Sequence, residues 1–309
     1  MPTIATLTMN PTIDVSYDVD RIAPTQKLRS HGESYDPGGG GINVARVFVR
    51  LGGNAECHYL SGGATGVALD GLLDLHQLVR RPVRIAGATR VACNVYERAS
   101  GQEYRFIPPG PTVTEEEWRT CLQQLANVTC DYIVASGALP PGVPPDFYGK
   151  VAQAADDRGV KFVLDTSGSA LGGGLSGACV HLIKPNEQEL EQLAGRPLVT
   201  DADIAAAAMD IVERGQAKLV AVTLGSRGGL LASAEGTQFL QAIPVKAASA
   251  VGAGDSFLAA MVHALATGRE VREAFRYGMA AGSAAVLTSG TGLCRVEDIE
   301  RLYAKAQNG

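Results

Sequence analysis

Ser249 to Phe257 read Ser-Ala-Val-Gly-Ala-Gly-Asp-Ser-Phe, and an apolar run of helical length follows them. Glycines adopt turn conformations that other residues avoid. The helix that follows offers unpaired N–H groups and the positive end of its dipole. A glycine turn that opens a helix is therefore predicted to hold an anion, and we expect Asp255, in the same positive end, to remain ionised at neutral pH.

This turn predicts phosphoryl transfer. An ionised carboxylate beside an anion hole can take a proton from an alcohol while the hole holds the phosphoryl group that the alcohol attacks. Asp255 is then the general base, and the N–H groups of Gly252, Ala253 and Gly254 form the anion hole. In the simpler interpretation, Asp255 only caps the helix, as aspartate often does.

A second glycine-rich stretch lies near the N-terminus. Residues 37–46 read Pro-Gly-Gly-Gly-Gly-Ile-Asn-Val-Ala-Arg, and residues 51–53 read Leu-Gly-Gly. With Val-Gly-Ala-Gly-Asp-Ser-Phe, this stretch resembles the paired signatures of the ribokinase-like (PfkB) carbohydrate kinases, over about Ile4 to Tyr303. The resemblance implies an α/β fold, a three-layer sandwich with a mainly parallel central sheet and a small β-sheet lid. It also implies ATP as co-substrate and Mg²⁺.

Composition limits the other classes of function. The 309 residues are 46% apolar and can bury a sizeable core, but no run of 18 apolar residues predicts a membrane span. A net charge of −5 argues against nucleic-acid binding. Six scattered cysteines without a C-x-x-C pair indicate reduced thiols, and the first residues lack a signal-peptide pattern. We expect a cytoplasmic protein without nucleic-acid or membrane partners. P-loop and protein-kinase motifs are absent from the sequence.

Strand-like and helix-like segments alternate along the chain, which predicts a mainly parallel sheet. The expected strands are 3–9, 56–60, 132–135, 161–164, 180–183 and 219–223, with a hairpin at 229–232 and 237–241. The expected helices are 42–51, 67–78, 115–125, 145–158, 201–214, 256–266, 271–287 and 296–306.

Two insertions interrupt this alternation. Residues 14–35 read as extended chain, and residues 90–107 read as a hairpin that turns at residues 99–102. We therefore expect a large domain of residues 1–13, 36–89 and 108–309 and a small sheet made from the two insertions. The resemblance implies that this sheet is a lid over the sugar and the contact of a homodimer.

Residues 184–190, Lys-Pro-Asn-Glu-Gln-Glu-Leu, follow an apolar strand. Asn186 and Glu189 are three apart, so both side chains can face the start of the next helix and hold the waters of Mg²⁺. The same spacing is also that of a capping box. The resemblance links this Asn-x-x-Glu element to magnesium and assigns Lys184 to the nucleotide site. Asp165, at the end of another strand, is either an outer ligand of the metal or a cap.

Two more glycine-rich turns lie outside the signatures. Residues 223–229, Thr-Leu-Gly-Ser-Arg-Gly-Gly, end a strand, and glycine there allows a ligand to approach the backbone. The resemblance assigns nucleotide contact to Thr223, Gly225, Gly228, Gly252 and Gly254, while the alternative for the 223–229 turn is a plain hairpin. Residues 172–177 match G-x-G-x-x-G but precede a strand, so we reject a dinucleotide site there and expect a mobile surface loop.

Four cations lie in the two insertions: Lys27, Arg29, Arg90 and Arg105. Singly, each reads as a solvated strand residue, but beside a lid they predict a clamp for a phosphate group, with Lys27 also supplying charge to catalysis. The resemblance assigns the sugar hydroxyls to Asp14, Gly38, Gly39 and Asn43. It further implies a monovalent-cation site, for example for K⁺, formed mostly by backbone carbonyls of Ser249, Val251, Ala285, Thr288 and Gly290.

Within the family, the chain most resembles the ATP-dependent 6-phosphofructokinases, in segments 27–29, 38–41, 103–106 and 136–142 and at Arg90. Ala138 departs from that pattern, which more often has serine. The implied reaction moves the γ-phosphoryl group of ATP to the 1-hydroxyl of fructose 6-phosphate. Tagatose 6-phosphate and fructose 1-phosphate are alternative substrates. A non-catalytic phosphosugar-binding regulator is a more distant alternative, which the presence of Asp255, Asn186 and Glu189 disfavours.

Overall fold

A large sheet forms the centre of the computed structural model, which describes residues 1–246, 249, 251–288 and 292–307. In these residues its strand order is β13-β12-β11-β10-β9-β8-β1-β4-β5. All pairs from β5 to β11 are parallel, and β12 and β13 add an antiparallel hairpin. The bounds are β1 Thr3–Thr8, β4 Asn54–Ser61, β5 Val79–Arg84, β8 Tyr132–Ser136, β9 Lys161–Asp165, β10 Val180–Ile183, β11 Ala217–Thr223, β12 Gly228–Ser233 and β13 Gly236–Gln241.

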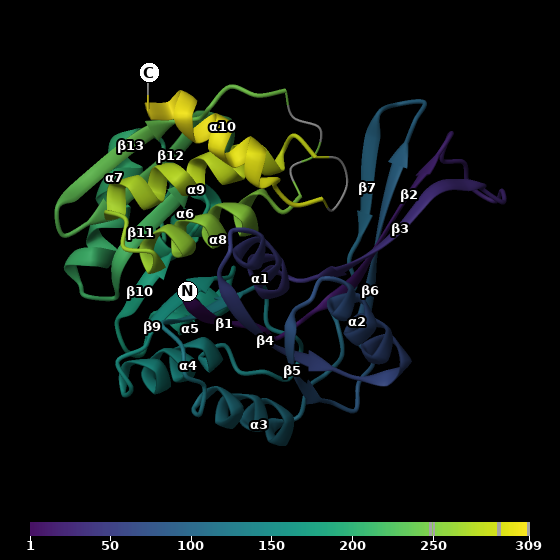
Figure 1. The fold of residues 1–309 in the computed structure, drawn as a ribbon, viewed down its shortest axis with the longest axis horizontal. Helices are drawn as coiled ribbons and strands as arrows, with labels where there is room; N and C mark the ends of the chain where they lie inside the picture. The colour runs from purple at the N-terminus through teal and green to yellow at the C-terminus, as the bar shows by residue number, and fades with distance from the viewer. Residues whose placement is uncertain (247–248, 250, 289–291, 308–309) are drawn as a thin grey trace.

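Helices cover both faces of this sheet and bury one apolar core on each (Figure 1). The helices on the first face are α1 Gly40–Arg50, α2 Gly63–Leu75, α8 Ala253–Ala266, α9 Val271–Ala285 and α10 Val296–Gln307. Those on the second face are α3 Glu115–Leu125, α4 Phe147–Asp156, α5 Ser169–Gly174, α6 Glu187–Ala194 and α7 Asp201–Glu213. A 3₁₀ turn, η1 Gly225–Arg227, precedes β12. The predicted three-layer α/β fold is confirmed.

The two insertions build a second sheet of four strands, in the order β3-β2-β6-β7. Its strands are β2 Thr12–Val19, β3 Ser30–Gly38, β6 Arg90–Glu97 and β7 Gln102–Phe106. Figure 1 shows this sheet extending away from the main body beside α1 and α2. Asp14 pairs with Asp36 and Ala92, and Arg105 pairs with Asn94. Because side chains alternate along a strand, Asp14 and Arg105 share one face of this small sheet.

Local sequence explains where several helices begin. Capping boxes start α3, α6 and α7, where Thr114, Asn186 and Thr200 each accept a backbone N–H from the residue three positions later. The acidic side chain at that later position accepts a hydrogen bond from the backbone N–H of the cap residue, so two unpaired donors are satisfied at once. These short patterns lie next to the predicted boundaries at Glu115 and Asp201.

Two elements differ from the sequence prediction. Strand β5 was not predicted, because Val-Arg-Arg-Pro-Val-Arg lacks an apolar pattern; it is an edge strand, where Pro82 costs no hydrogen bond in the sheet. The expected mobile loop at 172–177 is wrong. Gly174 ends helix α5, and a Cβ on Gly173 or Gly177 would lie within 2.8 Å of backbone atoms of Pro145 or Gly149. These glycines allow close packing against α4.

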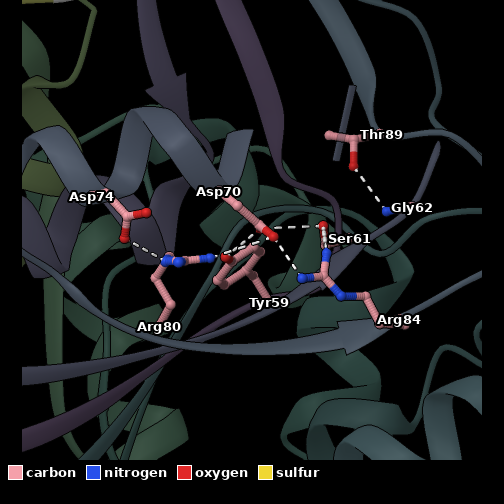
Figure 2. A network of polar contacts seen from close by, with 8 residues as sticks. All are labelled: Tyr59, Ser61, Gly62, Asp70, Asp74, Arg80, Arg84 and Thr89. Carbon is pink, nitrogen blue, oxygen red and sulfur yellow. Dashed lines mark hydrogen bonds and ion pairs between the residues drawn. The ribbon is translucent and has the colours of Figure 1, made fainter. Parts of the chain in front are cut away.

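A buried carboxylate, Asp70, joins helix α2 to strands β4 and β5 (Figure 2). It accepts a hydrogen bond from Tyr59 of β4 at 2.6 Å, and it pairs with Arg84 at 2.6 Å and Arg80 at 3.4 Å, both from β5. Just beyond, the Gly62 N–H donates to Thr89 Oγ1 at 3.2 Å, directly before β6. The network thus anchors α2 where the chain enters the small sheet.

No helix in the described ranges is long and apolar enough to cross a membrane.

Candidate active site

The predicted functional residues gather at the carboxyl ends of the parallel strands. Ser136 ends β8, Asp165 ends β9 and Thr223 ends β11, while Lys184 directly follows β10. The glycine run 38–41 lies against the ends of β1 and β8, since a Cβ on Gly40 would be 2.1 Å from Ser136 Oγ. In parallel sheets this edge is where ligands bind.

The glycine turn before α8 has the conformation that the sequence predicted. Gly252 has a φ of 74°, in the left-handed region that favours glycine, and α8 begins at Ala253. A Cβ on Gly254 would lie 3.1 Å from Lys184 Nζ. The helix N-terminus, with its unpaired N–H groups, therefore lies beside a lysine ammonium group, which makes the spot doubly favourable for an anion.

Lys184 is buried in an ion pair with Asp165, with 3.1 Å between Nζ and Oδ1. Burial opposes the ammonium charge, but the carboxylates of Asp165 and Asp255 outweigh burial and hold the pKa of Lys184 above its usual value. Ser136 Oγ donates to the other Asp165 oxygen at 3.2 Å. The lysine thus stays charged beside the α8 turn. The sequence marked Asp165 as a metal ligand or a cap, but not as the partner of Lys184.

Asp255 accepts a hydrogen bond from Asn43 Nδ2 at 2.9 Å, which joins the two signature stretches across 212 residues. Burial, helped by the nearby charge of Asp165, raises its pKa to about 6, while Asn43 and Lys184 oppose the rise. The prediction from sequence rested only on the helix dipole and did not include this upward shift of the pKa. With a pKa of about 6, the group is still mostly ionised at pH 7, and a pKa near the working pH suits a general base.

The small sheet brings Asp14 to the same region. Burial raises the pKa of Asp14 to about 6, against the charges of Arg105 and Arg90. Its carboxylate packs against the glycine run, since a Cβ on Gly38 would lie 2.2 Å from Asp14 Oδ2. Gly39, next in the run, has a φ of 112°. Both glycines are therefore required by local geometry, whether or not a sugar contacts them.

Arg90 lies where the small sheet meets the main body. It donates to the carbonyl of Asn10 at 2.8 Å and to that of Pro108 at 2.9 Å, and its Nε is buried without a partner. The side chain therefore ties together the chain entering β2, the chain leaving β7 and the start of β6. Arg105 Nε donates to Asn94 at 3.1 Å. Both cations keep further donors for a ligand.

The other two predicted cations lie elsewhere. Arg29 directly precedes Ser30, which pairs with Val19 at the far end of β2, whereas Arg90 pairs with Thr12 at the near end. Seven residues of strand separate these ends by roughly 23 Å. Within one chain, the structure thus separates Lys27 and Arg29 from Arg90 and Arg105 instead of bringing all four together. The sequence could not show on which end of the sheet each cation lies.

Asn186 and Glu189 form the capping box that was the alternative to a metal role. Asn186 Oδ1 accepts from the Glu189 N–H at 2.9 Å, and Glu189 Oε2 accepts from the Asn186 N–H at 2.8 Å. Burial raises the pKa of Glu189, and the charge of Asp165 adds to that rise. Oxygen donors with excess negative charge fit Mg²⁺, which keeps several waters. Among the described residues, no cluster of three or more His, Cys, Asp or Glu could hold a metal by itself.

The turn at 223–229 lies beside this capping box. The Thr223 N–H donates to Pro185 O at 3.0 Å, and Thr223 forms an isolated parallel bridge with Asn186. Gly225 has a φ of 58° and open space where a side chain would be, so a ligand could approach it. At Gly228, packing alone explains why the residue is glycine, because a Cβ there would lie 2.0 Å from Leu240 O in β13.

Part of the predicted monovalent-cation site is brought together. The Ser249 N–H donates to Val286 O at 3.4 Å, so the segment before the α8 turn meets the end of α9. Thr288 Oγ1 lies 2.7 Å from Ala285 O and 2.9 Å from Gly292 O. Val251 N–H donates to Ser249 Oγ at 3.3 Å. Gly290, the fifth predicted residue, lies outside the described residues.

A model of the pfkB family carbohydrate kinases matches residues 6–298. The chain belongs to this family. Among its relatives, the ATP-dependent 6-phosphofructokinase isozyme 2 of Mycobacterium tuberculosis is 42% identical over 99% of this chain and 90% of its own. The isozyme of the same name from Escherichia coli is 40% identical over 98% of this chain and 99% of its own. A 1-phosphofructokinase of Bacillus subtilis is 30% identical over 94% of each chain.

Solved structures place this PfkB kinase among the same relatives. Phosphofructokinase-2 from Escherichia coli in complex with potassium superposes with a TM-score of 0.95 at 40% identity, covering 99% of this chain and 100% of the other. Structures of the same bacterial enzyme with fructose-6-phosphate and in a tetrameric inhibited form both give TM-scores of 0.93. The family and fold predicted from the sequence are thereby confirmed.

The sequence pattern predicted no role for Arg46, the charged residue that ends the glycine-rich stretch 37–46 of this PfkB kinase. Arg46 lies on α1 three residues after Asn43 and is buried, with 5% of its surface exposed. The i, i+3 spacing places both side chains on one face of the helix. That spacing was a usable signal, because a buried cation one turn from a site residue needs partners there.

Proposed function

We infer that this chain is an ATP-dependent 6-phosphofructokinase, which transfers the γ-phosphoryl group of ATP to the 1-hydroxyl of fructose 6-phosphate. The observation that carries the inference is Asp255, held by Asn43 at the start of α8 beside the buried ammonium of Lys184. Relatives that carry this name are 40–42% identical over nearly the whole chain.

The proposed chemistry assigns one task to each group. The Asp255 carboxylate accepts the proton of the 1-hydroxyl, so the sugar oxygen can attack the γ-phosphorus. A new O–P bond forms there, and the bond from the γ-phosphorus to the oxygen shared with the β-phosphate breaks, which releases ADP. N–H groups of Gly252, Ala253 and Gly254, with the ammonium of Lys184, face the charge that develops on the phosphoryl oxygens.

The sugar phosphate is proposed to lie between the small sheet and α8. Asp14 and Asn43 offer hydrogen-bonding groups for hydroxyls beside the backbone of Gly38 and Gly39. Arg90 and Arg105 act on Asp14 electrostatically and retain donors for the 6-phosphate. The contributions of Lys27 and Arg29 require that a second copy bring its own sheet end to the site, because one chain keeps them at the far end of β2.

The metals are part of the proposal. Magnesium would be held through water by Asn186 and Glu189, where it would neutralise charge on the phosphates of ATP, whose contacts we propose include Thr223, Gly225 and Gly228. A potassium ion would use carbonyls of the segment around Ser249 and Val251 and of the end of α9, with Ala285 and Thr288. The relative from Escherichia coli has been solved in complex with potassium.

The chain is proposed to act as a homodimer in the cytoplasm. Tyr35 and Phe106 lie on the face of the small sheet opposite Asp14 and are 55% and 60% exposed, a pattern that calls for a partner. A second copy is the simplest occupant of an exposed sheet face with free edges. All six cysteines are free, which fits a reducing compartment.

A steady-state panel of phosphorylated hexoses with ATP tests the proposed activity. We expect fructose 6-phosphate to give the highest kcat/KM, and free fructose to be a very poor substrate because the cations of the site would lack a partner. Preference for fructose 1-phosphate or tagatose 6-phosphate would overturn the substrate assignment but keep the kinase. Binding of a hexose phosphate without turnover would favour a regulator.

A further inference from the structure

Arg46 is a buried cation that the proposed chemistry does not use. It lies on α1, and burial lowers its pKa, while Asp36 opposes that shift. An arginine nevertheless stays protonated under any working condition. Burying a full charge is unfavourable unless its partners are well placed, and replacing a whole buried ion pair by apolar side chains often leaves stability unchanged. Stability alone is therefore a poor reason for an arginine at this position.

The partners of Arg46 come from two directions. On one side, Nη2 donates to Asp36 Oδ1 and Nη1 donates to Pro37 O, both at 3.1 Å, and both residues belong to β3 of the small sheet. On the other side, Nη1 donates to Asn43 Oδ1 at 3.3 Å. Asn43 Nδ2 in turn donates to Asp255 Oδ2 at 2.9 Å. A continuous chain of hydrogen bonds thus runs from the small sheet to the start of α8.

Arg46 determines which way the Asn43 amide faces. A guanidinium has only donors, so it can pair only with the amide oxygen of Asn43. That pairing leaves the NH₂ group to face Asp255, whose carboxylate can only accept. Without Arg46 the amide could rotate and present its oxygen to the carboxylate, which would repel it. The orientation of the Asn43–Asp255 contact therefore depends on Arg46, whose hydrogen bonds go to Asp36, Pro37 and Asn43.

The hydrogen bonds of Arg46 to β3 also lie close to the proposed site. Asp36 and Pro37 directly precede the glycine run through which β3 joins α1, and Asp36 pairs in register with Asp14. The charge of Arg46 acts on Asp14 as well. A displacement of β3 would therefore be transmitted to Arg46, and from Arg46 to Asn43.

We propose that Arg46 is a positioning residue that couples the placement of the small sheet to the alignment of Asp255, by fixing the amide of Asn43. The base is aligned when β3 is docked on Arg46, and alignment is lost when this contact opens. The proposal rests on the proposed role of Asp255 as the base.

The test is a double-mutant cycle with Arg46→Met, which keeps an unbranched side chain but has no donors, and Asn43→Ala. In the wild-type background we expect Arg46→Met to lower kcat roughly 10- to 100-fold, since small misplacements of a reacting group have effects of this size. In the Asn43→Ala background the same change should lower kcat no more than about twofold, because residues that act in series are not additive. Arg46→Lys, which keeps one donor group, should restore part of kcat.

The pH profile separates positioning from support of the fold. The groups that act on the pKa of Asp255 are Asp165 of β9, Asn43 of α1, Lys184 after β10 and Asp14 of β2. The Asn43 hydrogen bond lowers this pKa, so its loss in Arg46→Met should move the acid limb of kcat/KM to higher pH in the wild-type background. A shift that persists in the Asn43→Ala background would come instead from Asp14, whose pKa the charge of Arg46 also lowers. Arg50→Met is the matched control: Arg50 lies one turn further on α1, is exposed, and donates to Cys294 O at 3.2 Å, away from Asn43. We expect its acid limb to be unmoved.

Three results would overturn the coupling: equal losses in both backgrounds, an acid limb that Arg46→Met leaves in place, or full activity in Arg46→Met. A melting temperature for each variant shows whether a loss of kcat is only a loss of folded protein. The proposed function fails separately, because a wild-type chain that prefers another hexose phosphate can still be put through the same cycle with that substrate.

Discussion

At the level of single residues, burial decides the electrostatics of the proposed site. Asp255 and Asp14 both have a pKa raised to about 6, and in each the removal of water from the carboxylate is the largest cause. Lys184 stays charged because the carboxylates of Asp165 and Asp255 outweigh its burial. The site therefore combines a buried lysine that stays charged with two carboxylates that protonate just below neutral pH.

Asp255→Asn removes the proposed base while keeping the size of the side chain. We expect kcat to fall roughly 10²- to 10⁴-fold with little change in the Kd for the sugar phosphate. In the wild type, kcat/KM should fall as the pH drops through about 6, because the raised pKa of Asp255 means that the base becomes protonated there. Steady-state rates from pH 5 to 9 measure both effects, and near-normal turnover of Asp255→Asn would refute the assignment.

Glu189→Gln separates magnesium binding from helix capping. An amide oxygen can still accept the Asn186 N–H, so the cap is retained while the charge is lost. We expect a higher Mg²⁺ requirement and a lower kcat with an unchanged melting temperature. The matched control is Glu117→Gln, in the capping box of α3 away from the site. If both variants give the wild-type magnesium titration, Glu189 only caps its helix.

At the level of elements, the junction between the small sheet and the main body is held by a few polar side chains. Arg90 bonds the carbonyls of Asn10 and Pro108, and Thr89 bonds the start of α2. Asp70 holds α2 to β4 and β5 below the same junction. The position of the proposed lid is therefore set by contacts at the junction, where the ends of its strands meet the main body.

Arg90→Ala should weaken binding of fructose 6-phosphate by about 2–5 kcal/mol, the range for removing one partner of a buried charge pair. The loss for ATP should be much smaller, because Arg90 lies on the small sheet. Arg214→Ala serves as control, since Arg214 pairs with exposed Asp210 at the end of α7, outside the small sheet. Kinetics with both substrates varied decide the matter: an equal rise in both KM values means that Arg90 acts only through the junction.

Asp70→Ala should lower the free energy of unfolding by about 2–3 kcal/mol. This is less than the 3–5 kcal/mol typical of a fully buried pair, because Arg84 is 58% exposed and can be hydrated when its partner is lost. Asp74→Ala, which removes a half-exposed carboxylate from Arg80, should change it by less than about 1 kcal/mol. Urea unfolding measures both, and equal effects would show that the buried network adds no stability.

At the level of the whole molecule, the small sheet leaves apolar side chains without a partner in one chain. We expect sedimentation at micromolar concentration to give about twice the 32.2 kDa mass of the chain. Phe106→Glu should shift the protein towards monomer, because it buries a charge in the proposed interface. Val199→Glu, at a residue that is 84% exposed and outside the small sheet, should not. A wild-type monomer would refute the dimer.

The sequence by itself determined the features that short patterns encode. Alternation of strands and helices, the glycine turn at Gly252, and the capping boxes at Thr114, Asn186 and Thr200 depend on residues at most a few positions apart. For the same reason, the two signature stretches were sufficient to identify the family. Strand β5 was missed because an exposed edge does not require an apolar pattern.

Only the tertiary structure decided what depends on distance and burial. The contact of Asn43 with Asp255 joins residues 212 positions apart, and the pair of Lys184 with Asp165 joins the ends of two strands. No local pattern encodes how much water a packed carboxylate loses, so the raised pKa of Asp255 could not be read from its neighbours in sequence. Likewise, long-range pairing sets the register of the strands, and this register places Arg29 and Arg90 at opposite ends of β2.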